Sequence, residues 1–340
     1  MAQPSYNFVD GTFFFFKAFG RRPVGALWIS LWQILLYAVI AFAALALIAP
    51  SFLEIVEVAA QDREPAPEDI LPLVGSLFAG QAVAILGSLL AAVLIQAAWL
   101  RFLARDEIAA VIPLRFGLDE LRLIGVNIIL AVLLGFGYFA LSFVFALFIG
   151  LSTTTIFAVG GESSAGAAVL VGLLIFVLAI AAIGVGIYFM IRFAAAPALT
   201  VKTRKFRLFE SFAATQGITL WMFLSYVVIG VLFMVILSFV AMIQFAVILA
   251  GASELIPTLE ALENTEDPRV VLQVLQDQVF QPGILIPLGI VILLQMLAQI
   301  FLDGSVHGVG AYAATRDQSA LMEDQVETPS ESVGDAPTLG

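Results

Sequence analysis

The side chains best suited to a chemical role form a polar row in the last apolar segment of the chain. The row consists of Gln295, Gln299, Asp303 and His307. Intervals of four residues put such side chains on one face of an α-helix. Asp303 and His307 could pair there, and a proton or a cation could use the row. The alternative is structural: the glutamines hydrogen-bond neighbouring helices, and Asp303 lies at the water boundary.

Catalytic constellations are otherwise missing from the sequence. The absence of cysteine excludes thiolate metal sites and cysteine nucleophiles, and a single histidine excludes a multi-histidine metal site. The three lysines, Lys17, Lys202 and Lys205, all lie outside the apolar segments, so none could form a buried Schiff base. No phosphate-binding loop, nucleophile elbow or dinucleotide fingerprint occurs either. We therefore expect no enzymatic activity, no cofactor and no metal site.

The composition of the chain indicates that the polar row lies in a membrane protein. Hydrophobic residues make up 61% of the sequence and charged residues only 12%, which is incompatible with a water-soluble globule. Six apolar runs are long enough to cross the roughly 30 Å hydrocarbon core as helices. They cover about 25–49, 73–100, 123–150, 166–193, 217–250 and 283–303. A closed barrel would instead show short alternating segments. We predict an all-α, polytopic membrane protein with six transmembrane helices.

The basic residues predict the orientation of these helices. Thirteen of the 15 Lys and Arg residues lie before the first span, between alternate spans or after the last one. Only Arg63 and Arg269 lie on the other side. Because cytoplasmic loops carry the excess of Lys and Arg, both termini are expected in the cytoplasm, in the inner membrane of a bacterium.

The net charge of −11 does not indicate a nucleic-acid-binding surface. Of 26 acidic residues, 13 fall in the proposed outer loops and seven follow Leu302, whereas the cytoplasmic loops are locally basic. We expect membrane lipids and other membrane proteins as partners, and no nucleic acid.

Three regions are expected along the chain. Residues 1–24 form an amphipathic cytoplasmic segment, 25–314 the six-helix domain, and 315–340 a disordered acidic tail. Within the last outer loop, Pro268 could begin a short helix that lies on the membrane interface or over the mouth of the bundle.

A repeated pattern precedes the odd-numbered spans. Phe116, Leu118 and Glu120 match Phe206, Leu208 and Glu210 at one offset of 90 residues, and the segment 8–23 has the same aromatic and basic character. We predict three repeated helical hairpins, each introduced by an amphipathic cytoplasmic lead-in segment. Chance similarity within a narrow composition is the alternative. The lead-in segments could engage anionic lipid or could simply orient the hairpins.

The string from Arg192 to Trp221, RFAAAPALTVKTRKFRLFESFAATQGITLW, is the most informative local pattern. It combines an arginine at a helix end, an Ala-Pro pair, a basic turn, an aromatic residue and a serine before Thr-x-Gly. The residues singled out in this candidate lead-in motif are Arg192, Pro197, Phe206, Glu210, Ser211 and Gly217.

In this combination the string resembles a segment of the bacterial six-helix membrane domains related to the glycerophosphoryl diester phosphodiesterase membrane domain and to the YciC-like group. The resemblance extends loosely over residues 8–314 and implies a six-helix membrane domain. Most members of that group have no established activity. The soluble phosphodiesterase domain that some relatives carry is absent from this sequence, so no hydrolase activity is implied.

Two functions follow as expectations. The first is a non-enzymatic scaffold, assembly factor or subunit of an envelope complex. The second is a transporter or lipid-handling protein that uses the polar row. A tightly filled bundle would favour the first function, and continuous space touching Gln299 and Asp303 would favour the second.

Overall fold

All regular structure in the described part of the chain is α-helical. The computed structural model describes residues 6–59, 66–109, 111–159, 164–262 and 282–316. Six helices within these ranges are long and apolar enough to cross a membrane. They are α3 (Pro23–Ala59), α4 (Pro67–Ala104), α5 (Leu118–Val159), α6 (Ser164–Phe193), α9 (Thr219–Leu262) and α11 (Pro282–Arg316). The prediction of an all-α membrane protein with six spanning helices is confirmed.

The helices are longer than the apolar runs that predicted them. Helix α5 has 42 residues, which at 1.5 Å per residue is about 63 Å and twice the thickness of the hydrocarbon core. The additional turns consist of residues flanking the apolar run. A helix continues through such residues because it satisfies its backbone groups internally and no Gly-Pro or Asn-Pro break intervenes.

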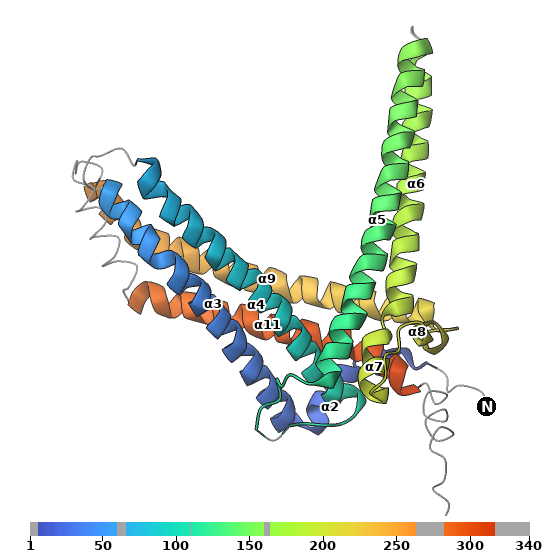
Figure 1. The fold of residues 1–340 in the computed structure, drawn as a ribbon, viewed down its shortest axis with the longest axis horizontal. Coiled ribbons are helices and arrows are strands. Elements are labelled where there is room, and N and C mark those ends of the chain that lie inside the picture. Colours follow the sequence, from blue (N-terminus) through green and yellow to red (C-terminus); the bar gives the residue numbers. More distant parts are fainter. Residues whose placement is uncertain (1–5, 60–65, 110, 160–163, 263–281, 317–340) are drawn as a thin grey trace, which may run out of the picture.

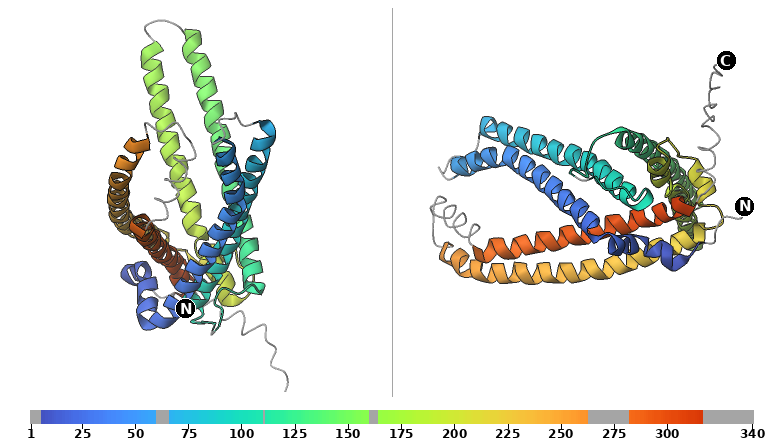
Figure 2. Two further views of the ribbon diagram at one scale, coloured as in Figure 1. Left: turned by 90° about the vertical axis from the view of Figure 1, so that its left-hand side faces the viewer. Right: turned by 90° about the horizontal axis from the view of Figure 1, so that it is seen from below.

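The long helices pack in pairs, α3 on α4, α5 on α6 and α9 on α11. Figures 1 and 2 show that the three pairs share one base and diverge from it. The α5–α6 pair stands apart from the other two over most of its length (Figure 1). The interior of the molecule is therefore concentrated at the base rather than along the spans.

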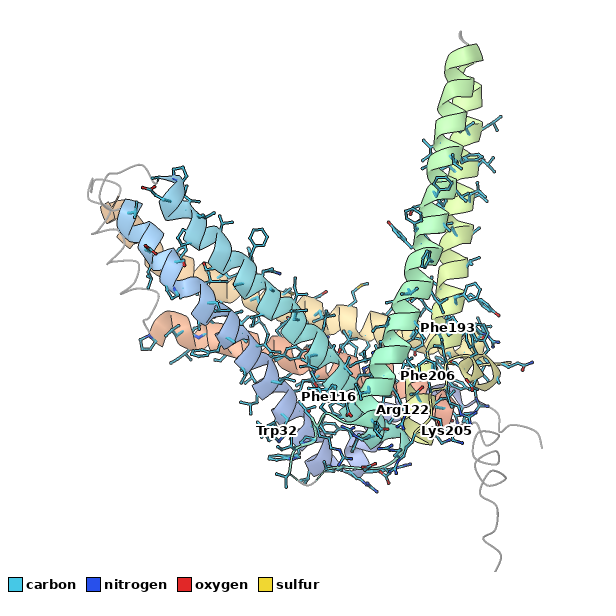
Figure 3. The ribbon with its side chains drawn as sticks, viewed as in Figure 1. Trp32, Phe116, Arg122, Phe193, Lys205 and Phe206 are labelled. Carbon is cyan, nitrogen blue, oxygen red and sulfur yellow. The ribbon has the colours of Figure 1, made fainter. Side chains whose placement is uncertain are left out.

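Four short helices complete this base. They are α1 (Phe8–Thr12), α2 (Phe14–Arg21), α7 (Ala196–Thr203) and α8 (Glu210–Ala214). Together with the adjoining ends of the six long helices they form a packed region that we call the junction. Helix α7 lies at its centre and contacts α4, α5, α11 and α8. Phe116, Arg122, Lys205 and Phe206 gather around this region (Figure 3).

The junction and the spans differ in the burial of their side chains. The largest buried side chains include Trp99, Phe15, Leu199 and Met222, all of which belong to one hydrophobic cluster at the junction. By contrast, no residue of the most apolar stretch of α5 or of α6 is buried. Glycine permits close packing at the junction: a Cβ atom at Gly304 would overlap the ring of Phe15, which places α2 directly on α11.

The residues matched by the 90-residue offset lie in different surroundings. Glu120 is buried within the first turn of α5, whereas Glu210 is exposed at the start of α8. Leu118 is exposed and Leu208 is buried. The described residues of 105–117 are not helical, and α5 begins directly at Leu118. The matched positions are thus not equivalent in the structure, and the internal repeat stays a prediction.

Two further expectations fall outside the described residues. These are the short helix beginning at Pro268 and the tail from 317 onward. Thr315 and Arg316, which the sequence assigned to the tail, are the last residues of α11.

Candidate functional site

A hydrogen-bond network joins three spanning helices through Asp303. Gln33 Nε2 of α3 donates to Asp303 Oδ2 at 3.2 Å, and Gln299 Nε2 donates to Asp303 Oδ1 at 2.8 Å. Trp99 Nε1 of α4 donates to Gln33 Oε1 at 3.1 Å. Gln33 is only 1% exposed, so both ends of its amide are satisfied inside the protein. Polar groups in a membrane need such partners, and this network links α3, α4 and α11.

The predicted polar row divides into parts with different neighbours. Gln295 Oε1 accepts from Gln244 Nε2 of α9 at 3.4 Å. His307 lines an apolar cavity, and the described residues contain no hydrogen bond or ion pair between it and Asp303. The four-residue interval does not decide this, since Gln299 lies at the same interval from Asp303 and is bonded to it. Both carboxylate oxygens of Asp303 accept from glutamines, whereas His307 lies among the side chains that line the apolar cavity. The anticipated Asp303–His307 pair is thus replaced by bonds from two glutamines.

A small cavity adjoins the network. It has a volume of about 230 Å³ and lies between α3 and α11, where Gln33, Tyr37, Gln295 and Gln299 line it. A further amide bridge joins α5 to α4, with Asn127 Nδ2 donating to Gln96 Oε1 at 2.7 Å. Interhelical hydrogen bonding, the structural reading of the intramembrane amides, accounts for these contacts.

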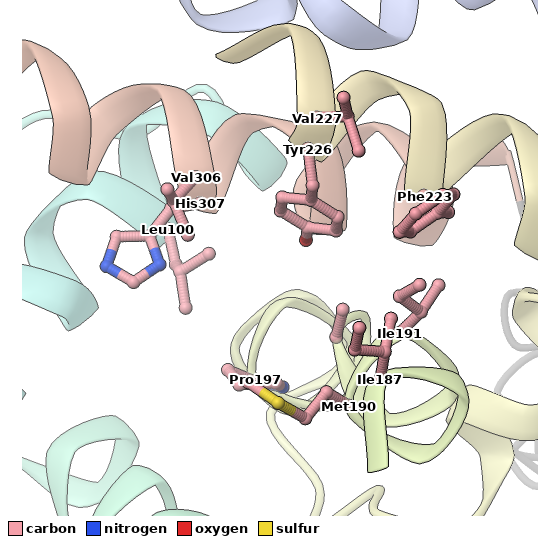
Figure 4. A pocket seen from close by; sticks show the side chains of 11 residues that line it. Leu100, Ile187, Met190, Ile191, Pro197, Phe223, Tyr226, Val227, Val306 and His307 are labelled. Carbon is pink, nitrogen blue, oxygen red and sulfur yellow. The ribbon is translucent and has the colours of Figure 1, made fainter. Parts of the chain in front are cut away.

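A larger cavity than this one lies where α6 diverges from α9 and α11. Its volume is about 480 Å³, within the range of small-molecule pockets. Figure 4 shows Phe223, Tyr226 and Val227 of α9 facing Ile187 and Met190 of α6 across it. Tyr226 and His307 are the polar side chains of its lining. The cavity can accept a hydrocarbon group, and two polar side chains belong to its lining.

The candidate motif from Arg192 onward forms a structural clasp. The guanidinium carbon of Arg192 lies 4.8 Å from the ring centre of Phe212. The backbone carbonyl oxygen of Arg192 accepts a hydrogen bond from Ser211 Oγ at 2.6 Å. These contacts fix α8 against the end of α6. Pro197 is in the first turn of α7 and lines the large apolar cavity.

The other motif residues do not converge on this clasp. Phe206 is partly exposed and lies over Gly125 of α5. Glu210 pairs with Arg207 at 3.7 Å. Gly217 has a φ of +75°, a conformation that glycine adopts without strain, and it forms the turn between α8 and α9. The motif therefore positions helices and builds no single site.

A cluster of charged residues was not singled out by the sequence pattern. Its arginines are Arg101, Arg105, Arg115, Arg122 and Arg204, and its carboxylates are Glu107, Asp119 and Glu120. We call this set the arginine cluster. Arg101 and Glu120 are almost completely buried and form an ion pair. The available signal was the occurrence of four carboxylates beside four arginines in the segment 101–122.

Glu107 lies among the arginines of this cluster and outside the spanning segments. Its carboxylate accepts from Arg105 Nη2 and from Arg115 Nη2, each at 2.7 Å. Burial raises the pKa of Glu107, but the attraction and hydrogen bonds of the two guanidinium groups outweigh it and lower the pKa overall. The carboxylate is therefore ionised at neutral pH.

Within the described ranges, no group of three or more His, Asp or Glu side chains is arranged to hold a metal ion. Comparison of the chain with protein-family models, with curated proteins and with solved structures gives no match. The resemblance to the YciC-like group therefore stays a prediction, and the function has to be argued from the geometry.

Proposed function

We propose that this integral membrane protein is non-enzymatic and handles lipid, with an acyl chain occupying the space where its helix pairs diverge. The observation that carries this proposal is the apolar cavity of about 480 Å³ between α6, α9 and α11. The proposal includes a bacterial inner membrane and cytoplasmic termini, which rest on the distribution of 13 basic residues against two.

The chemistry of the lining supports a hydrocarbon occupant. Ile187, Met190, Phe223 and Val227 present only carbon and sulfur to the cavity. The cavity lies between helices that are apolar enough to span a membrane, which supports a lipid occupant. An acyl chain gains dispersion contacts with these side chains.

The second candidate remains a scaffold, assembly factor or complex subunit. The α5–α6 pair favours it, because its exposed apolar side chains could pack against another membrane protein as well as against lipid. The small cavity touches Gln299, although Asp303 is not part of its lining, and together with the apolar cavity it supports lipid handling over a tightly filled bundle.

Native mass spectrometry of the purified protein in mild detergent tests the proposal. Val227 lines the cavity on α9, and Val235 is exposed two turns further along the same helix. We expect Val227→Trp to fill the cavity and reduce the number of retained phospholipids, whereas the matched Val235→Trp retains them. Equal lipid retention by both variants would reject the cavity as the lipid site.

The orientation has its own test, which the absence of native cysteine makes clean. The positions Asp62, Thr265 and Gln318 lie outside the described residues. Asp62→Cys and Thr265→Cys should react with impermeant thiol reagents in intact spheroplasts, and Gln318→Cys should not. The reverse pattern would invert the topology.

A further inference from the structure

The arginine cluster has more positive charge than its carboxylates neutralise. Five arginines face three carboxylates, which leaves an excess of two positive charges. All five arginines line a cavity of about 370 Å³ at the junction. This cavity is formed by the end of α4, the start of α5 and the loop after α7, and it is separate from the apolar cavity.

Part of the cluster is committed to the fold. The buried Arg101 pairs with Glu120 and donates Nη2 to the carbonyl oxygen of Pro113 at 3.0 Å. Arg105 uses Nη2 for Glu107 and Asp119 and donates Nη1 to Val201 O at 3.0 Å. These bonds hold α4, the following loop and α7 in fixed relative positions.

Arg105 also has one donor that no acceptor uses. Arg105 is 10% exposed, and its buried Nε has no hydrogen-bond partner in the described structure. A buried donor without an acceptor costs about 1–3 kcal/mol, and a bound anion that accepts from it would remove this cost. This observation is independent of the charge excess.

Two further arginines converge on one carboxylate. Arg115 lies 2.7 Å and Arg204 3.9 Å from the carboxylate oxygens of Glu107, which Arg105 also contacts. Three guanidinium groups around one carboxylate repel each other and have donors to spare. Arg204 is held there by a left-handed backbone, with φ of +56°, at the end of α7. Arg115 and Arg204 are more than half exposed and can reach a ligand from solution.

The start of α5 opens on the same cavity. Gly117 and Leu118 line it, and the amide groups of the first turn of this long helix carry partial positive charge. Asp119 and Glu120 offset this charge only in part, because both are engaged by arginines.

From these observations we propose that the arginine cluster binds a phosphate group. Guanidinium groups bind phosphate oxygens through paired, charge-assisted hydrogen bonds, and a helix N-terminus adds to the attraction. The site goes beyond the proposed acyl-chain cavity and does not depend on it. The phosphate belongs either to an anionic lipid headgroup or to a soluble molecule, since both present the same oxygens.

Thermal unfolding of the full-length protein in detergent tests the proposal with defined probes. These are inorganic phosphate against chloride at equal ionic strength, and dihexanoyl phosphatidylglycerol against dihexanoyl phosphatidylcholine. We expect saturable stabilisation by at least one anionic probe. Stabilisation by inorganic phosphate indicates a soluble source, and stabilisation by phosphatidylglycerol alone indicates a lipid headgroup. Stabilisation by neither probe would overturn the proposal.

The variants separate the cluster from general electrostatics. Arg115→Gln with Arg204→Gln removes two exposed charges of the cluster and should weaken the apparent affinity at least tenfold. Lys17→Gln with Arg21→Gln removes two charges elsewhere at the junction and should leave it unchanged. An equal loss in both double variants would reduce the effect to net charge and contradict the site.

Two controls accompany these variants, one for correct folding and one for independence from the acyl-chain cavity. If the double variant elutes abnormally on size exclusion, the single variant Arg115→Gln replaces it. This variant removes only one exposed side chain and should weaken the apparent affinity to an intermediate extent. Lipid retention in the Val227→Trp experiment should not change in the arginine variants. Failure of the phosphate site therefore leaves the cavity proposal intact, and the reverse also holds.

Discussion

The junction and the α5–α6 pair are built from the same kind of apolar sequence but differ in how they are held. Trp99 and Leu199 are fully buried at the junction, where the Arg101–Glu120 pair is also enclosed. In α5 and α6, the most apolar stretches have no buried residue. Deep burial and an enclosed ion pair thus coincide at the junction, whereas the most apolar described stretches of α5 and α6 lack such burial.

The difference follows from the solvent of each region. In lipid, apolar side chains gain little by leaving the solvent, so long helix pairs need few contacts with each other. At the membrane boundary water is present, and burying apolar surface there stabilises the fold by about 25 cal/mol per Å². We infer that the junction specifies the fold and that the spans are free to meet lipid.

Breaking the buried ion pair should have the largest effect. Arg101→Met alone, or Glu120→Leu alone, leaves one uncompensated charge in the junction and should cost about 3–5 kcal/mol. The double variant removes both charges and should recover most of this loss, as measured by unfolding in detergent. Arg115→Met, at a half-exposed pair, should cost less than about 1 kcal/mol. Single variants no worse than Arg115→Met would mean that the junction does not depend on the pair.

Truncating one leucine in each region tests the comparison directly. Leu199 is fully buried in α7, and Leu173 of α6 is 59% exposed. Leu199→Ala should destabilise the protein by about 2–5 kcal/mol because it leaves a cavity. Leu173→Ala should change the unfolding midpoint little, since its side chain meets lipid or detergent. A comparable loss at Leu173 would show that the α5–α6 pair is packed against another surface.

The sequence predicted the spans well because continuous apolar runs are a strong and local signal. It did not predict the junction, which depends on contacts between distant segments. Helix α7 has only eight residues, APALTVKT, nearly all buried on every side, so no periodicity distinguishes it from a loop. The partner of Arg101 could not be read from the sequence either, because Glu120 and Glu107 are both nearby acidic residues.

The polar row shows the same limit at the level of single residues. Spacing predicted that Gln299 and Asp303 would share a face, and they are hydrogen-bonded. Spacing could not predict that Gln33 and Trp99, from other helices, would complete the network. It suggested His307 as a partner for Asp303 on the same ground, and spacing could not show that glutamines bond to both carboxylate oxygens.

A smaller effect is expected at Asp303, where the network touches the membrane-spanning region. Asp303→Asn keeps an acceptor for the buried Gln33 and should cost no more than about 1 kcal/mol. Asp303→Leu removes that acceptor and should cost about 1–3 kcal/mol in the same unfolding assay. If Asp303→Asn leaves stability unchanged but alters ion or proton flux in proteoliposomes, the network has a pathway role. Equal stability of the Asn and Leu variants would exclude the structural role.

The smallest effect concerns pH and sharpens the contrast between the charged junction and the uncharged spans. The pKa of Glu107 is lower in the folded protein than its ordinary value of 4.5, because Arg105 and Arg115 favour the carboxylate over the opposing effect of burial. A carboxyl with a lowered folded pKa stabilises the fold above its unfolded pKa, and this contribution is lost as the pH falls through the folded pKa. Stability should therefore decline below about pH 4.5.

Glu107→Gln isolates this contribution. The variant should have a slightly lower unfolding midpoint than the wild type at pH 7. The difference between the two midpoints should shrink as the pH falls from about 4.5 toward the folded pKa. Because Glu107 is one third exposed, solvent screening keeps the difference small. Measuring both unfolding midpoints across this pH range in one detergent gives the comparison. A difference that stays constant with pH would mean that the Glu107 carboxylate contributes through packing or geometry rather than through its charge.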